Sequence, residues 1–171
     1  RKLPGDRWRL FRRDRDGEVT LRRSYAYVPA RPTALRRIVH ELSFSLSEAA
    51  SYLFAPRSAV TIIVSPPLLL GMAVGLLARL KGSRILFHVQ DLQPDAAIDL
   101  GMIRHRGMIK VLLALERMTY ALADRVSSIS LAMLGRIESK GVSREKLRLF
   151  RNWANDEMVS PVERDTRLRA E

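Results

Sequence analysis

The sequence of 171 residues contains no cysteine. Disulfide bonds, thiolate zinc sites and cysteine nucleophiles are therefore excluded for this chain, and the composition fits a reducing compartment. The motifs GxGxxG, GxxxxGK[ST], HExxH and GxSxG are absent as well. The three histidines, His40, His88 and His105, do not have the spacing of metal ligands. We therefore expect no metal site, no P-loop and no serine hydrolase here.

Acidic residues are few relative to basic ones. The chain has 30 Lys and Arg against 18 Asp and Glu, which gives a net charge of +12. Residues 1–37 alone hold 12 basic and four acidic residues. This excess indicates an anionic partner, which could be nucleic acid, an anionic membrane surface or a phosphorylated substrate. The alternative is a solvated basic face with no partner.

The longest apolar stretch, residues 59–80, raises the alternative of a transmembrane segment. The pair Pro66-Pro67 would break a spanning helix near its start, and Leu68–Leu80 alone is too short, so a buried strand and helix fit better. Arg1-Lys2 is not followed by an apolar core, which argues against a signal peptide. Because the first residue is not Met, we expect the sequence to begin inside a longer protein.

Residues 59–94 organise the chain. The β-branched run Val60–Val64 predicts a strand buried on both faces. Ser65 stands at an N-cap position, with Pro66 and Pro67 on the first helical positions. An apolar helix over 68–80 ends at Lys81-Gly82, and Ile85-Leu86-Phe87 predicts the next strand. This order is typical of a βαβ unit, whose ligands bind at the carboxyl edge of the sheet.

The rest of the chain continues the alternation of helices and strands. Two aromatic and β-branched runs, joined by an Asp-Gly turn signal, predict a basic hairpin over 8–12 and 19–27. Apolar spacing predicts amphipathic helices over 33–54, 107–123 and 131–140, and Ser130 is expected to cap the last of them. Short apolar runs predict strands over 126–129 and 147–150. Residues 92–106 are expected to be a polar loop. The predicted fold is α/β: a Rossmann-like, mostly parallel sheet with flanking helices, preceded by a short β-hairpin.

Right-handed crossovers would bring the strand ends to one edge and make Ser65, Asp91, Ser130 and Asn152 neighbours. His88 and Gln90 alternate along their strand and are expected on one side of it. Asp91 suits the binding of substrate hydroxyls, or alternatively an Asx-turn. For Asp95 the alternative is a helix or turn cap, and for His88 a hydrogen-bonded structural histidine.

Five segments together resemble the N-terminal domain of glycosyltransferase family 4, of the bacterial colanic-acid and exopolysaccharide type. They are VSPP at 64–67, HVQDLQPDAAIDLGM at 88–102, ERMTYALADRVSSIS at 116–130, KGVSREKLRLFRNWAN at 140–155 and YVPARPTALRRIVHELSFSLS at 27–47. The resemblance covers about residues 8–155. It implies the N-terminal half of a GT-B fold, in which two Rossmann-like domains enclose the active site.

The resemblance also implies roles for particular residues. In relatives, the position that Asp91 occupies faces the cleft near the transferred sugar, and many relatives carry His there. Asp91 is therefore the candidate catalytic residue, and the binding of substrate hydroxyls is its expected task. Substrate-binding positions are expected at His88, Gln90, Asp95, Ser65, Ser130 and Asn152. Residues 1–155 would form a partial acceptor-side domain without its first strand. Residues 156–171 would be a linker or the start of an absent donor-binding domain.

The expected function is that of a glycosyltransferase of cell-surface polysaccharide or lipopolysaccharide assembly. It would use a nucleotide-sugar as co-substrate, without cofactor or metal, and a saccharide acceptor that is often lipid-linked. The basic N-terminal region would hold it at the inner face of the cytoplasmic membrane, and this fragment alone would be inactive. The alternative is a non-catalytic basic module that binds nucleic acid or an anionic membrane, for which Trp8, Phe11 and Tyr25 supply interleaved aromatic residues.

Overall fold

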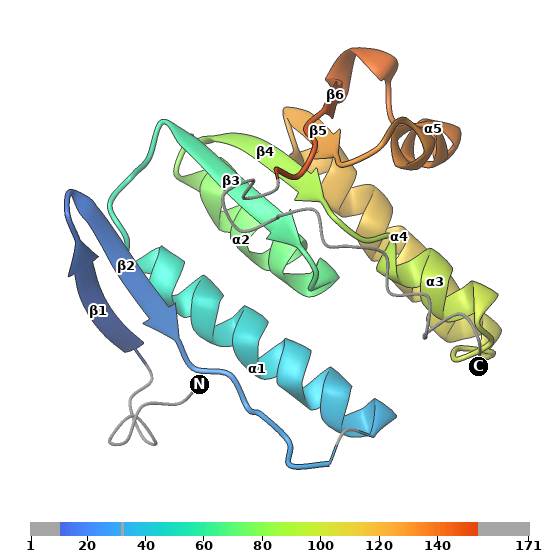
Figure 1. The fold of residues 1–171 in the computed structure, drawn as a ribbon, viewed down its shortest axis with the longest axis horizontal. Helices are drawn as coiled ribbons and strands as arrows, with labels where there is room; N and C mark the ends of the chain where they lie inside the picture. The colour runs from blue at the N-terminus through green and yellow to red at the C-terminus, as the bar shows by residue number, and fades with distance from the viewer. Residues whose placement is uncertain (1–10, 32, 154–171) are drawn as a thin grey trace, which may run out of the picture.

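The computed structural model describes residues 11–31 and 33–153, which form a β-hairpin followed by an α/β unit (Figure 1). In chain order the elements are β1 (Phe11–Asp16), β2 (Val19–Ser24), α1 (Ala34–Leu53), β3 (Val60–Ser65), α2 (Leu68–Leu80), β4 (Arg84–Val89), α3 (Gln93–Asp99), α4 (Arg106–Leu122), β5 (Arg125–Ser128), α5 (Leu131–Ser139), a 3-10 turn (Arg144–Lys146) and β6 (Leu147–Leu149).

The strands β3, β4, β5 and β6 form a parallel sheet in that order, with at least one helix in every connection. The predicted Rossmann-like α/β fold is therefore confirmed, and so is the hairpin, in which β1 and β2 pair antiparallel. The predicted strand at residues 8–10, which include Trp8, and the predicted linker at 156–171 lie outside the described residues. Residues 92–106 differ from the expected loop, because α3 occupies part of them.

The core lies on one face of this parallel sheet. Side chains from all four strands pack there with α2, α4 and α5; the strand residues are Ile63, Ile85, Phe87, Val89, Val126 and Leu147. On the other face of β3, Val60, Ile62 and Val64 are 42–62% exposed. The prediction that this strand is buried on both faces is thus wrong for the described part of the chain, because the helices that pack on the sheet share one side (Figure 1).

The start of α2 also differs from the prediction. Ser65 is the last residue of β3, where it pairs with Val89, and it does not cap the helix. The N-cap is Pro67, whose ring offers no side-chain hydrogen bond, and the helix begins at Leu68. Pro66 and Pro67 therefore precede the helix rather than open it, because Ser65 remains in the ladder of the sheet.

The inward side of the helix α1 combines Phe44 and Tyr52, which pack against the core, with serines that bond to the segment before the helix. The segment between the hairpin and α1 has no regular structure, and its backbone groups bond to α1: the Tyr27 N–H donates to Ser43 Oγ over 2.9 Å, and Ser47 Oγ donates to the Tyr25 carbonyl. Buried backbone groups need such partners. At the C-terminal end of α1, Lys81 Nζ donates to three carbonyls, those of Tyr52, Leu53 and Ala55, over 2.7–2.8 Å.

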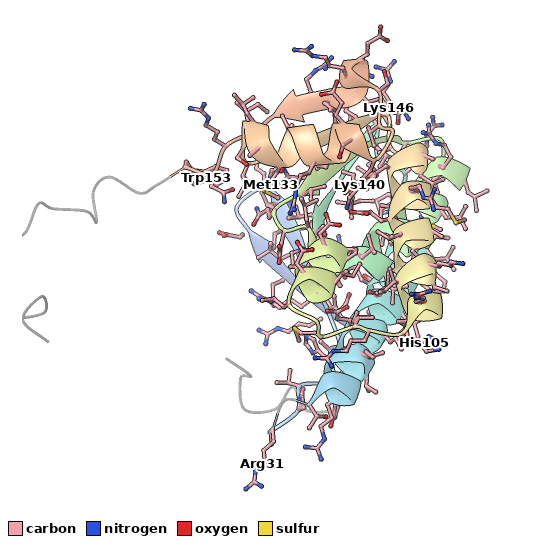
Figure 2. The ribbon with its side chains drawn as sticks, turned by 90° about the vertical axis from the view of Figure 1, so that its right-hand side faces the viewer. Arg31, His105, Met133, Lys140, Lys146 and Trp153 are labelled. Carbon is pink, nitrogen blue, oxygen red and sulfur yellow. The ribbon has the colours of Figure 1, made fainter. Side chains whose placement is uncertain are left out.

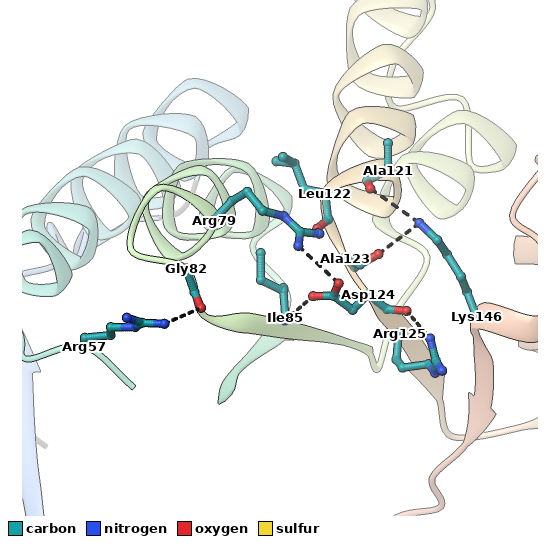
Figure 3. A network of polar contacts seen from close by, with 10 residues as sticks. All are labelled: Arg57, Arg79, Gly82, Ile85, Ala121, Leu122, Ala123, Asp124, Arg125 and Lys146. Atoms are coloured by element: carbon teal, nitrogen blue, oxygen red, sulfur yellow. Dashed lines mark hydrogen bonds and ion pairs between the residues drawn. The ribbon is translucent and has the colours of Figure 1, made fainter. Parts of the chain in front are cut away.

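A polar network connects the strands at the amino edge of the sheet, where the strands begin, opposite their carboxyl ends (Figure 3). Asp124 Oδ2 accepts the N–H of Ile85 over 2.7 Å, and its Oδ1 accepts a hydrogen bond from Arg79 over 3.1 Å. Lys146 donates to the carbonyl of Ala123 over 3.0 Å. Partial burial raises the pKa of Asp124, but the hydrogen bonds from Ile85 and Arg79 outweigh it, so the pKa lies below its usual value.

Candidate functional site

The four parallel strands end in one row. Ser65 pairs with Val89, Val89 with Ser128, and Ser128 with Leu149. Two backbone bonds extend this row by one residue, from the Gln90 N–H to the Ser65 carbonyl over 3.3 Å and from the Phe150 N–H to the Ser128 carbonyl over 2.9 Å. The expected common edge is therefore present, and the residues that follow the strands share it.

Gln90 and Asp91 are polar residues at the end of β4 that are open to solvent. Both are exposed, while Leu92 directly after them is buried with 7% exposure and is the N-cap residue of α3. Among the described residues, the Asp91 carboxylate has no hydrogen-bond or ion-pair partner, so the alternative of an Asx-turn finds no support. An ionised carboxylate without a partner can accept hydrogen bonds from the hydroxyl groups of a ligand.

His88 lies on the side of β4 that faces away from the helices. Its neighbours Phe87 and Val89 point into the core, whereas His88 lies between Ser127 and Phe150. The Nδ1 atom is 2.9 Å from Ser127 Oγ, and the ring meets Phe150 edge-on with the ring centroids 5.5 Å apart. Burial lowers the pKa of this imidazole, so the ring is neutral at pH 7. These contacts match the structural alternative for His88, whereas Gln90 is exposed.

The remaining predicted site residues have different surroundings. Ser65 is buried with 3% exposure, and Asn152 is exposed. Ser130 caps α5 as predicted, because its Oγ accepts the N–H of Met133 over 3.2 Å. Asp95 lies in the first turn of α3 and forms an ion pair with Lys140. Ser65 thus belongs to the row of strand ends, while Ser130 and Asp95 already have partners in the fold.

Three residues that were not predicted as site residues contact one another and Asp95. Lys140, which Figure 2 labels, forms a largely buried polar cluster with Glu116, Tyr120 and Asp95, where the end of α5 meets α3 and α4. The spacing of Glu116 and Tyr120, four residues apart on one helix, was the available signal. Burial and the Glu116 carboxylate together raise the pKa of the Tyr120 hydroxyl far above its usual range, so Tyr120 stays protonated.

The open face of the sheet carries a shallow groove of about 620 Å³. Its lining is mostly apolar with three arginines: Val60, Leu86, Leu149, Phe150, Arg84, Arg125 and Arg148 belong to it. Within the described ranges, no group of three or more His, Asp or Glu side chains could hold a metal ion. None of the helices described is long and apolar enough to cross a membrane.

A parallel, Rossmann-like sheet with exposed polar residues at its carboxyl edge is typical of α/β domains that bind a ligand at that edge. The chain belongs to the glycosyl transferase 4-like domain family, whose model matches residues 3–153. It is 32% identical over 154 residues to the protein named "Putative colanic acid biosynthesis glycosyl transferase WcaI" of Escherichia coli (strain K12). That match covers 86% of this chain and 37% of the relative's length. No solved structure matches the chain.

Proposed function

We propose that this chain is the acceptor-side part of a glycosyltransferase that transfers a sugar from a nucleotide-sugar to a saccharide acceptor, which is lipid-linked. The process would be the assembly of a bacterial cell-surface polysaccharide, in line with the colanic acid biosynthesis in the relative's name. The observation that carries the proposal is the exposed Asp91, which has no polar partner among residues 11–31 and 33–153, at the common strand edge of a chain that belongs to this family.

In this proposal Asp91 accepts hydrogen bonds from substrate hydroxyls and so orients the reacting sugar. Gln90, exposed beside it, supplies an amide that can donate to or accept from the same ligand. His88 is neutral and held by Ser127, and it supports the strand beneath these two residues. Ser65 and Asn152 border the site, whereas Ser130 and Asp95 contribute through the helices that they fix. The nucleotide-sugar is a co-substrate, and no cofactor is invoked.

The test is a transfer assay with the natural full-length protein, nucleotide-sugar donors and membrane lipid acceptors. A hydrogen bond to a charged group contributes about 1.5–3 kcal/mol, so Asp91→Asn should lower kcat/KM about 10- to 100-fold. Asp99→Asn is the matched control, because Asp99 is an exposed carboxylate at the end of α3. Equal activity of wild type and Asp91→Asn would refute the role of Asp91. The 171-residue chain alone should show no turnover, and measurable transfer by it would contradict that part.

The proposal also places the protein at the inner face of the cytoplasmic membrane. Support comes from the outer stripe of α1, which we define as Ile38, Val39, Leu42, Leu46 and Leu53; these apolar side chains are 40–68% exposed. The hairpin beside α1 carries exposed arginines, among them Arg13, Arg15 and Arg22. An apolar helix face next to a basic surface suits insertion at the headgroup level of anionic lipid.

Co-sedimentation with vesicles tests this location. The chain should bind vesicles that contain phosphatidylglycerol more tightly than vesicles of phosphatidylcholine alone, and salt should weaken the binding. Leu42→Ser with Leu46→Ser should reduce the affinity by about tenfold or more, because two leucines no longer enter the lipid. Leu80→Ser, at an exposed position of α2 outside the stripe, is the control. Salt-sensitive binding to DNA without binding to vesicles would instead favour a nucleic-acid module.

A further inference from the structure

A buried cluster of charges joins the three helices that follow the site. Lys140 Nζ lies 2.8 and 2.7 Å from the two carboxylate oxygens of Glu116 and 2.7 Å from Asp95 Oδ2. The hydroxyl of Tyr120 donates to Glu116 Oε1 over 2.9 Å. Glu116 is 2% exposed, while the side chains of Lys140 and Asp95 are each 18% exposed. One lysine thus pairs with two carboxylates that come from two different helices.

The short helix α3 has few other means to hold its position. It spans seven residues and begins without a side-chain cap. Its apolar anchors are Leu92 and Pro94, which are buried at its start. At its far end, Asp99 reaches Arg136 only over 3.6 Å, with both side chains more than 60% exposed. The Asp95–Lys140 pair is therefore the strongest polar contact of α3 within the described part of the chain.

The location of this pair matters because α3 begins directly after the exposed turn. Asp95 is four residues beyond Asp91, and the turn between them is held on its other side by the hydrogen bond from Gln90 to Ser65. If the first turn of α3 moved, Asp91 would move with it. Lys140 itself has its donors directed at Glu116 and Asp95 and does not face the strand edge.

We propose that Lys140 is a positioning residue, which holds the first turn of α3 through Asp95 and thereby fixes Asp91 at the strand edge. The proposal rests on the function proposed above, because it takes Asp91 as the residue that orients the acceptor. In this proposal Lys140, Glu116 and Asp95 act on the position of Asp91, and none of the three contacts the substrate. A displacement of about 1 Å in such a group costs up to about 100-fold in rate.

The test uses Asp95→Asn, which removes the negative charge from the contact between Lys140 and α3 but leaves the Lys140–Glu116 pair in place. Lys140→Met would leave Glu116 buried without a cation and could unfold the protein. Hydrogen exchange should be roughly tenfold faster at residues 90–96 of Asp95→Asn than in the wild type, and unchanged in β5. Asp99→Asn, on the same helix, should leave exchange at 90–96 unchanged. Unaltered exchange in Asp95→Asn would overturn the proposal.

Kinetics of the natural full-length protein test the link to Asp91. We expect Asp95→Asn to lower kcat/KM for the acceptor about tenfold, with the KM for the donor unchanged. In the Asp91→Asn background the same change should have little further effect, since both variants act on one group. Fully additive effects would overturn the link. If the wild type shows no transfer at all, the proposed function fails, and the exchange experiment alone then decides whether Lys140 holds α3.

Discussion

The close packing of α2 on the sheet and on α4 makes a specific prediction for Gly71. A Cβ at this position would lie 2.6 Å from Phe87 Cε2 and 2.6 Å from Thr119 Cγ2, far inside van der Waals contact. Phe87 and Thr119 are each 2% exposed, so neither has free space into which to move. Gly75 lies one turn further along α2, and a Cβ there would meet Leu122 at 3.7 Å, which is an ordinary contact.

The two glycines therefore form a matched pair for substitution by alanine. Both variants gain about 1 kcal/mol, because alanine favours a helix more than glycine does. Gly75→Ala should keep this gain. Gly71→Ala should lose it to overpacking, which costs about 1–3 kcal/mol in a tight core. Because the helix gain is common to both variants, we expect Gly71→Ala to be less stable than Gly75→Ala by about 1–3 kcal/mol, or roughly 2–12 °C in melting temperature for a chain of this length.

Urea and thermal unfolding of the two variants and the wild type would measure this difference, with circular dichroism at 222 nm as the signal. An unchanged urea m value would show that the variants differ in stability and not in the extent of unfolding. The reasoning would be refuted if Gly71→Ala were as stable as Gly75→Ala, because α2 would then not lie as close to Phe87 and Thr119 as the structure has it.

Two further predictions concern helix capping and the amino edge of the sheet. Ser130→Ala should cost about 1 kcal/mol in urea unfolding, because the N–H of Met133 loses its acceptor; Ser139→Ala, at the exposed end of the same helix, should cost less. Asp124→Asn should cost about 1 kcal/mol at pH 7, after its half-exposed arginine contact is discounted for solvent screening. Because the folded pKa of Asp124 lies below its usual value of 3.8, its stabilisation is complete above that value and is lost as the pH falls through the folded pKa. Unfolding at pH 7 and pH 3 should therefore show the difference between wild type and variant shrinking, and a constant difference would contradict this account.

The sequence predicted most of the strands and helices, because their apolar patterns are regular. Of the α-helices in the described residues, α3 alone was missed, since residues 92–106 contain polar residues and a glycine and lack a full apolar period. A local signal was present, with Pro94 and Asp95 in its first turn, where both residue types favour a helix start. Ser65 was misassigned as a cap because its backbone pairing with Val89 depends on a strand that lies over 20 residues further along the chain.

The sequence predicted which edge of the sheet carries the candidate site, but it did not predict the contacts between the side chains there. Strand order and handedness are enough to place Asp91 beside the end of β3. The partners of Lys140 could not be predicted in this way, because Asp95 and Glu116 reach it from helices that are 45 and 24 residues distant. Such long-range ion pairs depend on helix packing angles, which no local pattern specifies.

The helix α1 shows most clearly where periodicity stops being informative. Its apolar residues recur at helical spacing, which is correct for the helix, yet in the described structure Ile38, Leu42 and Leu46 face outward. The reason is the irregular segment before α1, whose backbone groups bond to Ser43 and Ser47 on the polar side. These hydrogen bonds, together with the packing of Phe44 and Tyr52 on the core, hold this side of α1 inward, and the apolar stripe is left for another environment. If anionic lipid is that environment, the same seryl contacts that hold the segment before α1 against the helix also keep the basic residues of the hairpin near the membrane surface.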